Sequence, residues 1–158
     1  YGGGKTGLMG QVADSALEAG GKVVGIIPTF LKQHEVAHPG LTELVVVDTM
    51  HQRKRLMLER SDAFVTLPGG IGTLEEFAEV LSWSHLGLHG KPIGLLNIRG
   101  FYHPLLALMT HFRSEGFVGE NSLDLVVSAG NTPKLIHRLA EAAQKHRPAG
   151  PHFTHEAI

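Results

Sequence analysis

Short apolar segments alternate along the chain with longer segments in which apolar residues recur every three or four positions. Five apolar segments are predicted to form strands: residues 22–27, 44–47, 63–67, 92–98 and 125–128. Five periodic segments are predicted to form helices: residues 7–19, 49–60, 73–86, 102–115 and 132–145. Because strands and helices alternate, the sequence predicts an α/β fold: a doubly wound parallel sheet with helices on both faces.

Two further segments lie at the ends of this pattern. Residues 1–4 have the character of a strand end, so we expect further residues to precede them in the intact protein. Residues 147–158 are rich in proline, histidine and glycine and are expected to form a flexible tail. A length of 158 residues suits one domain, which we place at residues 1–146.

Charge and composition argue against several classes of partner. The formal net charge is -1, so no broad basic surface indicates binding to nucleic acid or to anionic lipid. No apolar run approaches the ~20 residues needed to span a bilayer. The sequence contains no cysteine, which excludes disulfides and thiolate metal sites and suits a cytoplasmic protein.

Two glycine-rich turns connect a predicted strand to a predicted helix. The first glycine turn, residues 2–10, contains G-x-G-x-x-G as Gly2, Gly4 and Gly7; the second, residues 68–73, reads PGGIGT. Ligands of parallel sheets sit beyond the carboxyl ends of the strands, where backbone N–H groups of the next helix can hold a phosphate. The alternative is that the glycines only allow tight turns and close packing of helix on strand. Two such turns favour a nucleotide or sugar-phosphate ligand.

Two carboxylates, Glu75 and Glu76, follow the second glycine turn directly. Acidic side chains are unexpected behind a site for an anion. One explanation is local: Thr73 and Glu76 form T-x-x-E, the pattern of a capping box, and both acids favour the positive end of the helix dipole. The other explanation is chemical, with Glu76 facing a ligand.

A basic segment, MHQRKR at residues 50–55, opens the helix before the second glycine turn. Met50, Arg53, Met57 and Arg60 fall on one stripe of this helix. A solvated charged face is one interpretation, but an arginine between methionines is less typical of a plain surface.

Together these residues resemble the LOG family, cytokinin riboside 5'-monophosphate phosphoribohydrolases formerly described as lysine decarboxylase-like. Three motifs carry the resemblance: P-G-G-x-G-T-x-x-E at residues 68–76, G-G-G-x-x-G-L-M-G at residues 2–10, and M-H-x-R-K at residues 50–54. The segments at residues 83–97 and 100–102 are also similar to the family. The resemblance covers residues 1 to about 143.

The resemblance implies a Rossmann-like fold in which a strand and a helix precede this sequence, a function and a site. The function is hydrolysis of the N-glycosidic bond of purine (cytokinin riboside) 5'-monophosphates, such as AMP or isopentenyladenosine monophosphate, to free base and ribose 5-phosphate. Arg53 and Glu76 would be the catalytic pair. The remaining binding residues would be Gly69, Gly70, Gly72 and Thr73 around the phosphate, with Met50, Lys54 and Glu75 in or near the pocket and Gly4 from the first glycine turn.

The resemblance also implies a homodimer that uses neither a metal nor an organic cofactor. The helix predicted after the second glycine turn offers apolar side chains for burial, namely Phe77, Val80, Leu81 and Trp83. Its periodicity permits a dimer without requiring one.

The chemistry of this reaction explains a carboxylate close to a phosphate. Breaking the N-glycosidic bond places positive charge on the ribose, which Glu76 would stabilise while it orients or deprotonates the attacking water. Arg53 cannot act as a general acid near neutral pH, so it would fix Glu76 or polarise the departing base. We expect Glu76→Gln and Arg53→Ala each to abolish turnover while the fold is retained.

Three other interpretations stay open. A sensor or carrier could bind nucleotides on the same fold without catalysis. Gly4-Lys5-Thr6 matches the end of a P-loop, with Asp48 as a magnesium ligand, but that leaves the second glycine turn without a role. Histidine pairs at i, i+4 spacing, His34/His38 and His85/His89, suit packing or surface positions better than a metal site.

Overall fold

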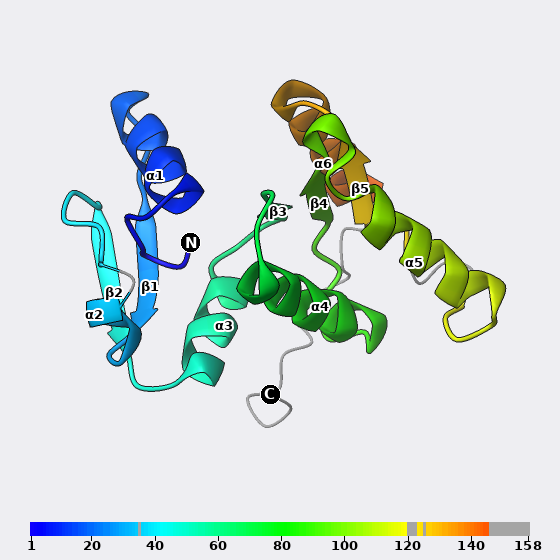
Figure 1. Cartoon of the computed structure of the whole chain (residues 1–158), viewed down its shortest axis with the longest axis horizontal. Helices are drawn as coiled ribbons and strands as arrows, with labels where there is room; N and C mark the ends of the chain where they lie inside the picture. The colour runs from blue at the N-terminus through cyan, green and yellow to red at the C-terminus, as the bar shows by residue number, and fades with distance from the viewer. Residues whose placement is uncertain (35, 120–122, 125, 146–158) are drawn as a thin grey trace. The chain divides into compact units, whose positions relative to one another are not determined.

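The computed structural model describes residues 1–34, 36–119, 123–124 and 126–145. It divides into two compact units, Tyr1–Ser61 and Asp62–Ile158. Both units contain parallel strands and helices (Figure 1), which confirms the predicted α/β, Rossmann-like class. A single domain over residues 1–146 stays a prediction. The tail predicted over residues 147–158 lies outside the described residues.

The first unit holds a two-stranded parallel sheet. Its elements follow the order α1 (Leu8–Glu18), β1 (Val24–Pro28), α2 (Leu31–His34), β2 (Glu43–Val47) and α3 (Met50–Glu59). The strands pair from Val24↔Glu43 to Pro28↔Val47. Ile26 and Ile27 of β1 are fully buried, as expected for the near-continuous apolar run of a parallel strand.

The beginning of the chain pairs with β1 as a strand would. The Tyr1 nitrogen donates to the carbonyl of Val24 at 2.9 Å, and the Tyr1 carbonyl accepts from Ile26 N–H at 2.9 Å. These two bonds follow the pattern of a parallel ladder. The predicted strand end at residues 1–4 is therefore present as pairing, although only Gly4 is assigned to a β-bridge, with Ala37.

Helix α3 begins at a capping box. The Thr49 hydroxyl accepts from Gln52 N–H at 3.1 Å, and the Gln52 side chain accepts from Thr49 N–H at 3.3 Å. Each bond satisfies a backbone donor that the helix itself cannot pair. This local signal sets the first residue of the helix, Met50, and so fixes where Arg53 falls.

The second unit holds a three-stranded parallel sheet in the order β3-β4-β5. Its elements are β3 (Phe64–Thr66), α4 (Ile71–His85), β4 (Ile93–Leu96), the 3-10 helix η1 (Ile98–Gly100), α5 (His103–Ser114), β5 (Val126–Ala129) and α6 (Thr132–Lys145). Strand β4 is buried along its whole length. Both carboxyl ends that concern the site, those of β3 and β4, belong to this sheet.

Alternate residues of β4 face different helices. Ile93 and Leu95 belong to one core cluster, which also contains Phe77 of α4 and Met109 of α5. Leu96 belongs to the other cluster, with residues of α6. Helices therefore cover both faces of this sheet, as predicted. Full burial of an aliphatic side chain contributes about 1.5–3 kcal/mol, so β4 is a major source of this unit's stability.

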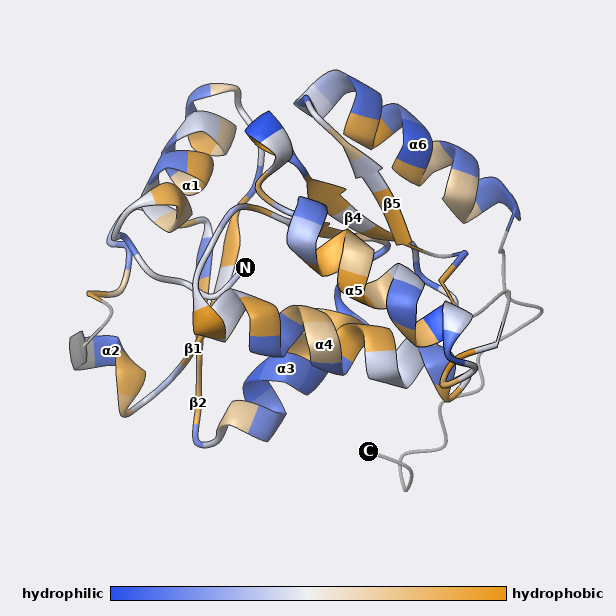
Figure 2. Ribbon diagram, turned by 45° about the vertical axis from the view of Figure 1, so that its right-hand side comes forward, coloured by the Kyte–Doolittle hydropathy of each residue, from blue (hydrophilic) through white to orange (hydrophobic). Residues whose placement is uncertain are grey.

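Helix α6 is strongly amphipathic, with hydrophobic and hydrophilic residues alternating along it in Figure 2. Leu135, Leu139 and Ala142 are its buried residues, at the spacing of one helical face. Among the described helices, none combines the length and the apolar character that a membrane span requires.

Helix α4 uses its apolar side chains inside its own unit. Phe77 is buried in the core, and Val80 and Leu81 pack against the same cluster. The burial expected for these apolar side chains is thus complete for Phe77 and partial for Val80 and Leu81, and the homodimer stays a prediction.

Candidate functional site

The first glycine turn is held by backbone pairing. Lys5 N–H donates to the Val36 carbonyl at 3.0 Å, and His38 N–H donates to the Gly3 carbonyl at 2.9 Å. Gly4, between them, is buried and forms an antiparallel bridge with Ala37. Several backbone groups of this turn are thus already used within the unit. A binding role for Gly4 stays a prediction.

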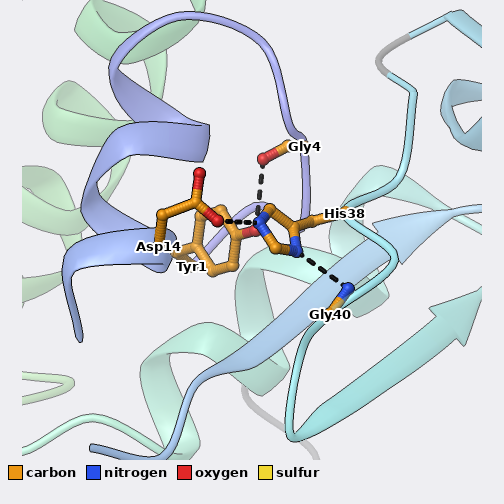
Figure 3. A network of polar contacts seen from close by, with 5 residues as sticks. All are labelled: Tyr1, Gly4, Asp14, His38 and Gly40. Carbon is orange, nitrogen blue, oxygen red and sulfur yellow. Dashed lines mark hydrogen bonds and ion pairs between the residues drawn. The ribbon is translucent and has the colours of Figure 1, made fainter. Parts of the chain in front are cut away.

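A polar network surrounds this pairing (Figure 3). The backbone N–H of Gly40 donates to Nδ1 of His38 at 3.1 Å, and Nε2 of His38 lies 2.9 Å from Oδ1 of Asp14. Since a backbone N–H can only donate, Nδ1 is the acceptor and Nε2–H donates to Asp14. The Tyr1 hydroxyl donates to the Gly4 carbonyl at 3.1 Å. Burial, followed by the Asp14 charge, raises the pKa of Tyr1.

Arg53 is buried in the first unit, with 4% of its surface exposed. Its Nε donates to the Ile26 carbonyl at 3.2 Å and its Nη2 to the Gly2 carbonyl at 3.1 Å. Nη1 lies 3.8 Å from the sulfur of Met50, one turn earlier on α3. Of the predicted stripe, Arg53 is buried, Met50 and Met57 are half-buried, and Arg60 is exposed. The guanidinium ties α3 to β1 and to the first glycine turn.

Sterics explain glycine at two positions of the first turn. A Cβ at Gly2 would lie 2.1 Å from Nη2 of Arg53, and a Cβ at Gly10 would lie 1.9 Å from the Lys5 carbonyl oxygen. Neither position accepts a larger side chain without movement of its neighbours. For these two glycines the packing interpretation is sufficient.

The second glycine turn opens helix α4 and is exposed. Helix α4 begins at Ile71, with Gly70 as its N-cap, and its first intrahelical bond in this region is Leu74 N–H to the Gly70 carbonyl at 3.1 Å. The N–H groups of Ile71, Gly72 and Thr73 precede that bond, so the helix does not pair them. Three donors at the positive end of a 15-residue helix suit an anion.

The glycines of this second turn differ among themselves. A Cβ at Gly69 would lie 2.2 Å from Oγ1 of Thr73, so Gly69 allows that side chain to lie against the turn. Around Gly70 and Gly72, apart from the adjoining backbone of the same segment, no described heavy atom lies within 4 Å of the corresponding position. Gly70 has φ -94 and Gly72 lies within the helix, so neither needs the left-handed backbone that favours glycine. Neither packing nor backbone conformation explains these two glycines.

The predicted capping box at Thr73 and Glu76 is wrong. Because α4 begins at Ile71, Thr73 is the third helical residue, and the Gly70 cap carries no side-chain bond. Glu75 and Glu76 lie in the second turn of the helix, where the dipole acts weakly. Glu75 is exposed and Glu76 is half-buried. Helix capping therefore does not account for the carboxylate of Glu76.

Two polar residues that the sequence did not single out contact the approach to this turn. The Tyr102 hydroxyl donates to the Leu67 carbonyl at 2.5 Å, and Tyr102 N–H donates to Oδ1 of Asn97 at 2.7 Å. Asn97 follows β4 directly, and Leu67 follows β3. The signals for them were the segments at residues 83–97 and 100–102, which resembled the family without indicating a role.

Two histidines are buried among the residues that the structure describes, His38 and His89, and both have ordinary protein partners. His38 bonds Asp14 and Gly40, as described above. Nε2 of His89 lies 2.8 Å from the Val80 carbonyl, and Lys91 N–H donates to its Nδ1 at 3.1 Å. Desolvation by burial lowers the pKa of His89, and the Lys91 charge adds to this, while the Val80 bond opposes it. Among the described residues, His, Asp and Glu form no group of three that could hold a metal.

The predicted site residues are divided between the units. Gly4, Met50, Arg53 and Lys54 belong to the first unit, whereas Gly69 to Glu76 belong to the second. Met50 and Lys54 are half-buried on α3. Within the second unit, Gly69 and Gly70 precede α4, Gly72 and Thr73 lie in its first turn, and Glu76 lies in its second turn. This arrangement, a glycine turn that opens a helix at the end of a parallel strand, defines the class of Rossmann-like α/β proteins.

Comparison with known proteins narrows this class to one family. Residues 9–139 match the family model described as "Possible lysine decarboxylase". The chain belongs to this family, the LOG family.

Curated relatives carry a more specific description. A cytokinin riboside 5'-monophosphate phosphoribohydrolase of Rhodococcoides fascians is 60% identical over 75% of this chain and 60% of its own length. A rice protein named "Probable cytokinin riboside 5'-monophosphate phosphoribohydrolase" is 50% identical over 89% of this chain and 62% of its own. An Arabidopsis thaliana cytokinin riboside 5'-monophosphate phosphoribohydrolase is 47% identical over 92% and 68%. The chain thus spans about three fifths of the length of the first two.

Proposed function

We propose that this protein hydrolyses the N-glycosidic bond of a purine nucleoside 5'-monophosphate, such as AMP or a cytokinin riboside 5'-monophosphate. The products are the free base and ribose 5-phosphate. The names of the relatives support this reaction. In this reaction the bond from C1' of the ribose to the base nitrogen breaks, a bond from C1' to a water oxygen forms, and a proton from the water reaches the base.

The proposal is supported most directly by the open space and the ordinary backbone conformation at Gly70 and Gly72. Apart from the adjoining backbone of the same segment, no described heavy atom lies within 4 Å of a Cβ position at either residue, and neither backbone requires glycine. The advantage of glycine here is open access to the N–H groups at the start of α4. A phosphate dianion is the group that such a helix terminus binds best. The 5'-phosphate would therefore be the handle by which the nucleotide is held.

Glu76 is proposed as the catalytic carboxylate. It lies one turn further along α4 than Thr73, and the resemblance to the family implies that it faces the ribose of a nucleotide whose phosphate is held at the helix terminus. A carboxylate there stabilises the developing positive charge on the ribose and orients the attacking water. Glu75 and Thr73 are proposed to contribute to binding.

Arg53 is proposed as the second catalytic residue, with Met50 and Lys54 near the ligand. Its guanidinium is buried and supplies several N–H donors. Participation of Arg53 together with Glu76 rests on the resemblance to the family, because the two residues belong to different units.

The protein is further proposed to be a cytoplasmic homodimer that needs no cofactor. The lack of cysteine in the sequence suits a reducing compartment. Apolar side chains are exposed on α4, where Ile71 and Leu74 are 83% and 44% exposed. Light scattering coupled to gel filtration would measure the mass in solution, and a monomer over the whole working concentration range would contradict the dimer.

The test of function is product formation. The full-length natural protein would be incubated without added metal with AMP and, separately, with isopentenyladenosine 5'-monophosphate, and the products separated by chromatography. Equal amounts of free base and ribose 5-phosphate are expected, and the ratio of the two rates gives the substrate preference. Tight nucleotide binding with no product from either substrate would instead support a sensor or carrier on the same fold.

A further inference from the structure

Tyr102 connects the loop after β4 to the approach to the second glycine turn. Its hydroxyl donates to the carbonyl of Leu67, which immediately precedes the PGGIGT segment, although the two residues are 35 positions apart. Its backbone N–H donates to Oδ1 of the buried Asn97. Asn97 N–H in turn donates to the Ala129 carbonyl at the end of β5, at 2.8 Å. One chain of bonds thus links the carboxyl ends of all three strands of the second unit.

The hydroxyl of Tyr102 is held in one position and stays protonated. The side chain is 7% exposed and packs in the core cluster with Phe77 and Leu95. The ring also meets Phe101 edge-on, with 4.9 Å between ring centroids. Burial raises the pKa of Tyr102, so the hydroxyl remains a donor throughout the working pH range. A donor held in this way restrains the carbonyl that it binds.

The restrained carbonyl controls the geometry of the turn. Strand β3 ends at Thr66, and Pro68 has no N–H, so the Leu67 peptide has few other means of being fixed. Rotation of this peptide would change the direction in which the chain enters Gly69 and Gly70. These glycines have no side chain to restrict that rotation. The direction of the N–H groups at the start of α4 depends on that entry angle.

We propose that Tyr102 is a positioning residue for phosphate binding by the second glycine turn. It does not touch the ligand but holds the Leu67 carbonyl, and through it the N–H groups that receive the phosphate. This inference rests on the proposed function, because it names a residue that supports the phosphate subsite of that reaction.

The test uses Tyr102→Phe, which removes the hydroxyl and retains the ring that packs in the core. The matched control is Thr110→Val on α5, which removes a hydroxyl that donates to the Leu106 carbonyl at 2.9 Å on the exposed side of that helix. Binding of AMP, of ribose 5-phosphate and of adenosine, which lacks the phosphate, would be measured by calorimetry. KM and kcat would be measured in the hydrolysis assay.

For Tyr102→Phe we expect the Kd of AMP and of ribose 5-phosphate, and the KM of AMP, to rise about 3–10-fold, the range of one lost hydrogen bond. The Kd of adenosine and kcat should change little, and Thr110→Val should match the wild type in all of these. A lower melting temperature with unchanged phosphate affinity would overturn the proposal and leave Tyr102 a structural residue. An equal loss for AMP and adenosine would overturn it as well. A wild-type protein that binds neither AMP nor ribose 5-phosphate would overturn the proposed function itself, and the role of Tyr102 with it.

Discussion

The two glycine turns look alike in sequence but differ in what their glycines do. In the first turn, a Cβ at Gly2 or Gly10 would collide with Arg53 or with the Lys5 carbonyl. In the second turn, Gly70 and Gly72 are surrounded by open space within the described structure. A glycine whose Cβ position is occupied by other atoms is required by packing. A glycine that neither packing nor backbone conformation requires is available to a ligand.

The surrounding contacts show the same contrast. The first turn is paired with residues 36–38 and bordered by the contacts of His38 and Arg53. The second turn is held at its base by Tyr102 on Leu67, and it ends in N–H groups that helix α4 does not itself pair. We infer that the first turn mainly shapes its unit, whereas the second mainly binds.

The largest effect is expected at the carboxylate behind the second turn. Glu76→Gln should lower kcat by about 10²–10⁴-fold, because the neutral amide can neither stabilise positive charge on the ribose nor accept a proton from water. The Kd of AMP should stay close to the wild-type value. Steady-state kinetics and calorimetry would measure both quantities. Glu141→Gln, an exposed change on α6, is the control and should leave kcat unchanged; near-wild-type turnover by Glu76→Gln would remove Glu76 from the mechanism.

The next effect concerns the arginine beside the first turn. Arg53→Ala leaves the carbonyls of Ile26 and Gly2 without their donor, at a cost of about 1–3 kcal/mol for each unsatisfied group. This variant is therefore expected to lose stability as well as turnover, which revises the expectation from sequence that the fold is fully retained. Urea denaturation would measure the free energy of unfolding.

Arg60→Ala provides the matched control on the same helix. Arg60 is exposed and pairs with Glu43 at 3.0 Å, an interaction worth about 0–1 kcal/mol at a surface. Equal free energies of unfolding for the two variants would show that the buried contacts of Arg53 contribute little to stability. The first turn would then no longer differ from the second in its structural role.

A pair of alanine substitutions tests the contrast between the turns directly. Gly10→Ala should lower the free energy of unfolding by about 1–3 kcal/mol, because the methyl group meets backbone that has to move. Gly72→Ala should leave stability unchanged or raise it by up to about 1 kcal/mol, since alanine favours the helix.

The same two variants should also differ in their affinity for AMP. Gly72→Ala places a methyl group at the approach to the N–H groups, so the Kd of AMP should rise about tenfold, which is about 1.4 kcal/mol. Chemical denaturation and calorimetry on both variants would provide the comparison. If Gly72→Ala binds AMP as the wild type does, open space at that glycine has no bearing on ligand binding.

The smallest effect is a dependence of the second unit on pH. The folded state lowers the pKa of His89, mainly through burial, so it favours the neutral ring. The unfolded chain takes up a proton below about pH 6.5, and the folded chain does so only at lower pH. The stabilising contribution is therefore complete above about pH 6.5 and decreases as the pH falls below it.

The measurement compares the free energy of unfolding at roughly pH 7.5 and pH 5.5. The wild type should lose more stability over this range than His89→Gln does, whatever the absolute stability of the variant. His137→Gln, a change at an exposed histidine of α6, should retain the wild-type dependence. An identical pH dependence in His89→Gln and the wild type would contradict the role of His89.

Local features were the ones that could be predicted from sequence. The apolar segments became strands within a few residues of their expected bounds, and the capping box at Thr49 was confirmed because its bonds span only three positions. The second glycine turn was placed correctly between β3 and α4. The prediction of a capping box at Thr73 was wrong, although the sequence signal was equally local. The glycine turn starts helix α4 at Ile71, so Thr73 lies two residues inside the helix and cannot cap it.

The sequence by itself determined the α/β order, the family and the candidate residues, because periodicity and motifs depend on neighbouring positions. Only the tertiary structure decided which glycines are enclosed, that Arg53 is buried against β1, and that Phe77 lies in the core of its unit. It also joined Tyr102 to Leu67 and His38 to Asp14, across 35 and 24 positions. Contacts of this range depend on how strands and helices pack, and no local pattern in the chain encodes them.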